Sequence, residues 1–261
     1  NFVDYFVLNS LDSIAWLLNI RGKDIEYTPL LFCYLIIPKE GKVELFIDNK
    51  KIYPIKTEIQ KIANISSFEN TSVYIRNLNS NRVIGFDENY TSYYFKQLSI
   101  KQKLKFKNIE NPCLYLKAIK NSTELSGAKS ANQRDGVSII KFLYWLKNKM
   151  DINKTDEIIA ANYLFNLRKK NKLFYSLSFD TISAIGPNAA LPHYRVNNES
   201  KLKFSNNSIY LVDSGAQYKD GTTDITRTII IGKSSHEQKD RFTRVLKGHI
   251  AIAKAEFSYN T

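Results

Sequence analysis

The sequence predicts a mixed α/β protein with two domains. Strand-like and helix-like segments alternate through roughly the first 115 residues, which is typical of an α/β domain. A long stretch with helical apolar spacing then begins near residue 121, and a β-hairpin pattern and another amphipathic helix come after it. With 261 residues, of which 43% are hydrophobic, the chain can bury two cores of ordinary size. We expect the domains to be residues 1–118 and 119–261.

The first domain is expected to interleave short strands and helices. Ser10 ends the first strand-like run and is a candidate N-cap for the helix that follows. A Lys-Glu-Gly-Lys connection between two β-rich runs indicates a hairpin. The expected elements in chain order are a strand at 4–10, a helix at 11–19, strands at 29–38, 41–48 and 81–89, and a helix at 91–98.

The second domain is expected to begin with a long helix. Asn121 followed by Glu124 resembles a capping box, and the apolar periodicity then continues to Leu146 with a break near Gly136. Thr155 is the expected N-cap of a second helix. The later elements are that helix at 156–171, a strand ending at 185 with a Gly-Pro-Asn turn after it, a hairpin at 210–232 and a helix within 234–257.

Composition favours a cytoplasmic protein without a nucleic-acid or membrane partner. The formal net charge is +13, but lysines are spread from Lys23 to Lys254, which indicates a solvated basic surface rather than a nucleic-acid footprint. The longest apolar run, Leu30 to Ile37, is far shorter than the roughly 18–20 residues of a membrane span. Cys33 and Cys113 lie in apolar surroundings, so we expect buried, reduced thiols.

Two aspartates interrupt the otherwise apolar and β-branched hairpin at 210–232, which has Asp220-Gly221 in its turn. In a register centred on the Lys-Asp pair of the turn, Asp213 opposes Thr226 and Asp224 is its diagonal neighbour. In the alternative register, in which the numbers of two paired residues add up to two less, Asp213 and Asp224 are directly opposed. Either register places both carboxylates on one face unless a bulge intervenes, with side-chain roots about 4.5–8 Å apart.

Two such carboxylates need something that offsets their repulsion, which is roughly 4 kcal/mol at 4 Å and an effective dielectric near 20. A shared proton, an arginine or a divalent metal would each do so. Arg227 is adjacent to Thr226, but strand neighbours face opposite sides. Carboxylates on rigid strands suit one or two divalent ions, whereas the alternative is that one or both aspartates lie exposed at a strand end without a function. His193, after the Pro turn, is in the same way a site residue or a structural histidine.

The segments around these residues resemble the cytosolic, three-domain Xaa-Pro aminopeptidases of the pita-bread metallopeptidases. The resemblance is carried by residues 178–195, 210–232 and 242–257 for the catalytic domain, by 116–146 for its start, and by 8–38 for the preceding non-catalytic domain. It implies a creatinase-like α/β domain followed by an incomplete pita-bread domain. Prolidases and methionine aminopeptidases fit less well, because the resemblance extends through the preceding domain.

The resemblance implies a role for each candidate site residue. Asp213 matches a ligand of one ion and Asp224 a ligand that bridges both ions of a dinuclear site, usually Mn²⁺. A water held between the two metals has a lowered pKa and attacks the peptide bond before a proline in second position. His193 matches a histidine that lines the substrate pocket and positions or stabilises the reacting bond.

The resemblance also implies what the sequence lacks. The remaining ligands of the family, one histidine and two glutamates, find no match in this sequence. We therefore expect a fragment that by itself is inactive and leaves the metal site unoccupied. The alternative is a non-catalytic pita-bread module that binds peptides or proteins. Full-length relatives imply a homodimer.

Overall fold

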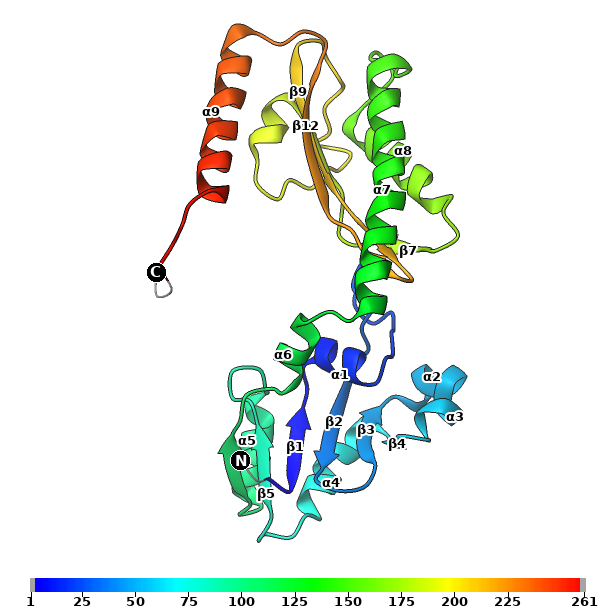
Figure 1. Ribbon diagram of the computed structural model, residues 1–261. Coiled ribbons are helices and arrows are strands. Elements are labelled where there is room, and N and C mark those ends of the chain that lie inside the picture. The colour runs from blue at the N-terminus through cyan, green and yellow to red at the C-terminus, as the bar shows by residue number, and fades with distance from the viewer. Residues whose placement is uncertain (1–2, 259–261) are drawn as a thin grey trace. The chain divides into compact units, whose positions relative to one another are not determined.

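The computed structural model describes residues 3–258, which form two compact units (Figure 1). The first unit ends at Ser122 and the second begins at Thr123. Among the helices of the described residues, none has the length and hydropathy needed to cross a bilayer.

Within the described residues, the first unit is built on a mixed six-stranded sheet in the order β4-β3-β2-β1-β5-β6. The strands are β1 (Tyr5–Leu8), β2 (Cys33–Pro38), β3 (Val43–Ile47), β4 (Ala63–Ser66), β5 (Val83–Phe86) and β6 (Lys105–Asn108). β2 pairs antiparallel with both β1 and β3, whereas β3–β4, β1–β5 and β5–β6 are parallel. The predicted hairpin of β2 and β3 is confirmed.

Helices cover both faces of this sheet and create two cores. They are α1 (Leu11–Leu17), α2 (Asn49–Ile52), α3 (Lys56–Ile59), α4 (Thr71–Arg76), α5 (Tyr93–Lys101) and α6 (Cys113–Ala118). Phe6 and Leu8 enter one core with Cys33 and Cys113, and Val7 between them enters the other. Both thiols are buried as predicted, and burial raises the pKa of Cys33 to about 12. Ser10 precedes α1 as expected, although its side chain makes no capping hydrogen bond.

In the second unit, the first two helices pack against two small sheets in the orders β12-β9-β8 and β11-β10-β7. Its helices are α7 (Ser122–Asn148), α8 (Glu157–Lys169) and α9 (His236–Ala253). Its strands are β7 (Phe174–Leu177), β8 (Ile182–Ile185), β9 (Ser208–Ser214), β10 (Ala216–Tyr218), β11 (Gly221–Thr222) and β12 (Ile225–Ile231). α7 continues through Gly136, and its residues Ile139 and Phe142 share a core with Leu164 of α8 and Tyr210 of β9.

The start of α8 differs from the prediction by one residue. Asp156, not Thr155, is the N-cap, because an Asp156 carboxylate oxygen accepts a hydrogen bond from the Ile159 backbone at 2.8 Å. Thr155 instead donates its hydroxyl to the Asp151 carbonyl at 2.8 Å. Burial opposes ionisation of Asp156, but hydrogen bonds from the helix N-terminus and from Lys201 hold the pKa of its carboxyl below the ordinary value.

The last helix, α9, is amphipathic as predicted, with a capping box formed by Ser235 and Gln238. In the described residues, however, its apolar side is exposed, with exposed residues that include Phe242, Val245, Leu246 and Ile250. His249 lies on that side of the helix, where a core or an interface histidine is expected, and it is exposed, which excludes a core position within the described residues.

The predicted hairpin passes from one sheet to the other. Asp213 of β9 pairs with Thr226 of β12, and Tyr218 of β10 pairs with Gly221 of β11, so the register centred on the Lys-Asp turn is confirmed. The strand changes sheets at Gly215, where a Cβ atom would collide with the Thr223 carbonyl oxygen. Only a residue without a side chain lets the two strands approach so closely here.

We expect the change Gly215→Ala to lower the free energy of unfolding by about 1–3 kcal/mol, because the added methyl group must displace a backbone carbonyl. Urea unfolding of the protein measures the change. Gly136→Ala is the matched control, because a Cβ atom on this α7 glycine meets open space. The control should be neutral or stabilising by up to about 1 kcal/mol, and equal stabilities of the two variants would contradict the argument.

Candidate active site

A pocket of about 330 Å³ on the second unit brings together residues that are distant in sequence. Asp213 on β9, Thr226 on β12 and His193 after the Gly-Pro-Asn turn all line it. The other lining residues are apolar and comprise Ile182, Ala189, Ala190, Leu191, Pro192 and Leu211. Two of the three predicted site residues therefore share one cavity that combines an apolar wall with a carboxylate and an imidazole.

Asp213 is held on the central strand of its sheet. Its backbone pairs with Thr226 on one side and with Ile182 of β8 on the other, so its position is fixed from both edges. Its carboxylate oxygen Oδ1 is buried and has no hydrogen-bond partner within the described residues. A buried oxygen without a partner is costly, by about 1–3 kcal/mol or more for a charged group. The Asp213 carboxylate therefore suits a cation or a donor that comes from outside the chain.

Asp224 lies in the segment between β11 and β12, next to the Ile225–Ser214 pair. Its side chain is exposed, and it is not among the residues that line the pocket of Asp213 and His193. Within residues 3–258, no group of three or more histidine, cysteine, aspartate or glutamate side chains is arranged to hold a metal ion. The described residues thus offer carboxylates to a metal but no cluster that encloses one.

His193 has an unusual backbone conformation. Its φ angle is 53°, in the left-handed region, where a non-glycine residue costs of order 1–3 kcal/mol. Its side chain is exposed at the pocket, whereas the neighbouring Tyr194 is buried. The surrounding structure must therefore hold His193 in place. Buried side chains of the second unit contact the segment that carries His193.

The Glu157 carboxylate, in the first turn of α8, is completely buried and bonds to the residue that follows His193. It accepts hydrogen bonds from the Ile185 backbone at 2.7 Å and from the Tyr194 hydroxyl at 2.9 Å. Burial raises the pKa of Tyr194, and acceptance by Glu157 adds to the rise. In the sequence, Glu157 falls in the first turn of the helix expected at 156–171, where an acidic residue suits the macrodipole and no buried role is evident.

A separate buried network is the ion pair of Asp135 on α7 and Arg168 on α8. The guanidinium donates from Nε and Nη2 to the two carboxylate oxygens of Asp135 at 2.7 and 2.8 Å. Asp135 also accepts hydrogen bonds from the Tyr218 hydroxyl at 2.8 Å and from the Thr223 hydroxyl at 3.0 Å. Burial and the negative charge of Asp135 both raise the pKa of Tyr218.

This ion pair was missed in the sequence, although a signal existed. Asp135 stands four residues after Ala131 and four before Ile139, and both of these are buried on the same face of α7. Arg168 stands four residues after the buried Leu164 of α8. A charge in the apolar stripe of each of two helices is the pattern of a buried pair.

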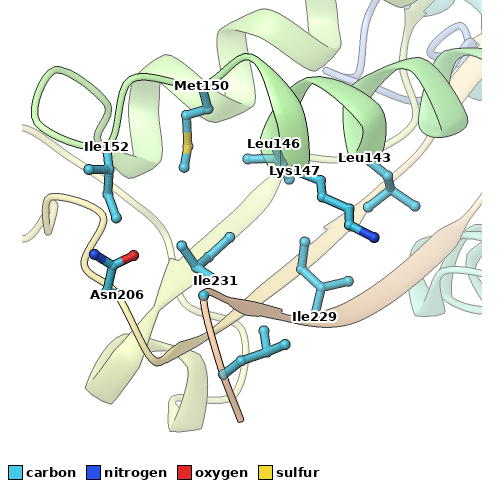
Figure 2. Close-up of a pocket in the computed structure, with 10 residues that line it drawn as sticks. Leu143, Leu146, Lys147, Met150, Ile152, Asn206, Ile229 and Ile231 are labelled. Atoms are coloured by element: carbon cyan, nitrogen blue, oxygen red, sulfur yellow. The ribbon is translucent and has the colours of Figure 1, made fainter.

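A larger pocket of about 860 Å³ lies between the end of α7 and β12 (Figure 2). Leu143, Leu146 and Met150 face Ile229 and Ile231 across it, with Lys147 and Asn206 as polar neighbours. None of the described residues that line it is a carboxylate or an imidazole. Lys147 is the ionisable residue in that lining, and an ammonium group is not a metal ligand, so the smaller pocket with its carboxylate and imidazole is the candidate site.

Comparison with known proteins identifies both parts of the chain. Residues 1–124 match the family Creatinase/Prolidase N-terminal domain, and residues 126–259 match Metallopeptidase family M24. The X-prolyl aminopeptidase from Caenorhabditis elegans, described as a cytosolic enzyme with a di-nuclear active site, is 33% identical with a TM-score of 0.87. That likeness covers 98% of this chain and 43% of the other. The predicted fold class, with a creatinase-like domain before a pita-bread domain, is confirmed.

Curated relatives agree with this match. The chain is 39% identical to Xaa-Pro aminopeptidase 1 of Dictyostelium discoideum, over 97% of this chain and 41% of that protein. It is 40% identical to the probable Xaa-Pro aminopeptidase P of Neosartorya fischeri, over 98% of this chain and 40% of that protein. The chain therefore spans about 40% of the length of these relatives. The prolidase from Pyrococcus horikoshii, at 21% identity and a TM-score of 0.73, shares the fold.

Proposed function

Because the chain belongs to metallopeptidase family M24, we propose that it takes part in removing the N-terminal residue from peptides with proline in second position. Residues 1–118 would be the non-catalytic domain and residues 119–261 the first part of the catalytic domain. The observation that carries the proposal is the buried Oδ1 of Asp213, which has no hydrogen-bond partner among residues 3–258 and lies in the pocket that His193 also lines. The names of the curated relatives support the Xaa-Pro specificity.

The proposed mechanism gives each residue of this chain a task. Asp213 and Asp224 would hold divalent ions, and Mn²⁺ suits such oxygen donors. When bound, the metals would supply a water that is nucleophilic at neutral pH. The His193 imidazole would bind and orient the carbonyl of the reacting peptide bond.

The apolar wall of the pocket has its own task in the proposal. Ile182, Leu191 and Leu211 line the cavity beside Asp213, where they would receive apolar parts of the peptide and exclude water. Water exclusion strengthens the electrostatic effect of the Asp213 and His193 side chains. A cytoplasmic location, which the buried thiols of Cys33 and Cys113 support, and a homodimer complete the proposal.

The test is an assay of residue release from an Xaa-Pro peptide, with an otherwise identical Xaa-Ala peptide as control. Both the 261-residue chain and the full product of its gene are assayed, with Mn²⁺ and with a chelator. We expect release by the full product to require metal, to return when Mn²⁺ is restored, and to be much slower on the Xaa-Ala peptide. A full product that never releases the first residue with Mn²⁺ present would exclude the aminopeptidase.

A second function is a non-catalytic module that binds peptides. It is favoured by the finding that no metal-holding cluster of three or more ligand side chains exists among residues 3–258. Calorimetry with an Xaa-Pro peptide and with Mn²⁺ separates the two functions. Peptide binding that is unchanged by metal favours the module, and tight Mn²⁺ binding that the change Asp213→Asn weakens favours the peptidase.

A further inference from the structure

We infer that Glu157 is a positioning residue that fixes His193 at the pocket, an inference that rests on the proposed function. Glu157 itself is not among the residues that line the pocket. It acts through the loop between β8 and Leu202, which carries His193. Glu157 would thus act on the imidazole of His193 without contacting the substrate.

One carboxylate closes this loop at several points. Glu157 Oε1 accepts hydrogen bonds from the Ile185 backbone at 2.7 Å and from the Asn188 amide at 3.1 Å. Glu157 Oε2 accepts from the Tyr194 hydroxyl at 2.9 Å and from the Leu202 backbone at 3.0 Å. The donors thus come from the end of β8, the Gly-Pro-Asn turn, the residue after His193 and the end of the loop.

His193 lies between two of these anchored residues. Asn188 precedes it and Tyr194 follows it directly, and both side chains also bond to the Ser200 carbonyl at 3.1 Å. With its ends held in this way, the short segment can maintain the left-handed φ of 53° at His193. Without the carboxylate, that backbone would relax toward a commoner conformation and carry the imidazole away from Asp213.

The chemistry of the cluster requires a carboxylate rather than an amide. Every polar group that faces the Glu157 side chain is a donor, namely two backbone N–H groups, the Asn188 amide and the Tyr194 hydroxyl. A glutamine has one acceptor oxygen and a donor NH₂ group, so it would place a donor against a donor. Glu157→Gln keeps the size of the side chain and removes this complementarity.

The experiment is a double-mutant cycle in the full product of the gene, with kcat and KM measured on an Xaa-Pro peptide. We expect Glu157→Gln to lower kcat by roughly 10- to 100-fold with a smaller change in KM, as for other residues that orient an active-site group. In a His193→Ala background, Glu157→Gln should change kcat less than about twofold, because the residue to be positioned is gone. Equal effects of Glu157→Gln in both backgrounds would overturn the inference.

Two tyrosines provide a matched pair of more conservative variants, each of which loses only a hydroxyl group. Tyr194→Phe removes a donor to Glu157 next to His193, whereas Tyr210→Phe removes a buried hydroxyl that bonds to Ser183 and does not hold the loop. We expect Tyr194→Phe to lower kcat several-fold and Tyr210→Phe to leave it within about twofold. Equal losses of kcat in Tyr194→Phe and Tyr210→Phe would indicate a merely structural role and would overturn the inference. This comparison decides the matter even if Glu157→Gln does not fold.

A measurement without catalysis separates this inference from the proposed function. In the NMR spectrum of the 261-residue chain, the His193 ring should show one sharp environment that Glu157→Gln shifts or broadens and Tyr210→Phe does not. An unchanged His193 signal in Glu157→Gln would overturn the positioning role even in an active enzyme. If the wild type is inactive but Glu157→Gln still changes the His193 signal as expected, only the proposed aminopeptidase activity is refuted.

Discussion

Asp213→Asn is expected to lower metal-dependent release of the N-terminal residue by at least about 100-fold, because even a partner of a metal ligand typically contributes 10- to 100-fold. An asparagine keeps the shape of Asp213 but removes the charge that a cation requires. The same variant should lose at least about tenfold in Mn²⁺ affinity by calorimetry. Activity is measured in the full product of the gene, at saturating peptide and a range of Mn²⁺ concentrations.

The stability of this variant distinguishes a functional carboxylate from a structural one. Asp213 Oδ1 is buried without a hydrogen-bond partner among the described residues, so its charge does not stabilise the fold. We therefore expect Asp213→Asn to unfold at the same urea concentration as the wild type or a higher one. Asp180→Asn is the control, because Asp180 is exposed and does not line the pocket. A variant that kept more than half of the activity would refute the role of Asp213.

Arg168→Met is expected to lower the free energy of unfolding by about 3–5 kcal/mol, the usual result of leaving one charge of a buried pair without its partner. Arg168 is completely buried, and it holds both oxygens of Asp135. Methionine fills a similar volume, so the loss reflects the uncompensated carboxylate rather than a cavity. Urea unfolding followed by circular dichroism measures the change.

The ion pair also makes hydrogen bonds to the sequence neighbours of the two candidate metal ligands. Arg168 reaches the Ser214 carbonyl, next to Asp213, and Asp135 accepts from Thr223, next to Asp224. The double change Asp135→Asn with Arg168→Met should recover part of the stability, because no unpaired charge remains.

The control for this pair is Asp220→Asn, which breaks the partly exposed ion pair with Arg134. It should cost less than about 1 kcal/mol. A loss in Arg168→Met no larger than in Asp220→Asn would show that the Asp135–Arg168 pair is not a principal support of the fold.

Local patterns predicted much of the fold. The Asp-Gly turn and alternating apolar residues predicted the hairpin, and the pairing of Asp213 with Thr226 selected one of its two registers. Helical spacing predicted α7, α8 and α9. The N-cap of α8 was wrong by one residue because Thr155 and Asp156 are both good caps, and the choice depends on contacts with Asp151 and Lys201.

The sequence by itself determined the two-domain α/β order, the hairpin with its two aspartates, and a resemblance specific enough to name the metallopeptidase family. These follow from residue types and short spacings, which are local properties of the chain. Only the tertiary structure decided that His193 and Asp213 share a pocket while Asp224 lies exposed outside its lining. Only the structure likewise showed that the carboxylates of Glu157 and Asp135 are buried and accept hydrogen bonds from distant residues. The partners of these carboxylates are 28 to 88 residues away in the chain, and such contacts form only when folding brings distant donors to one acceptor.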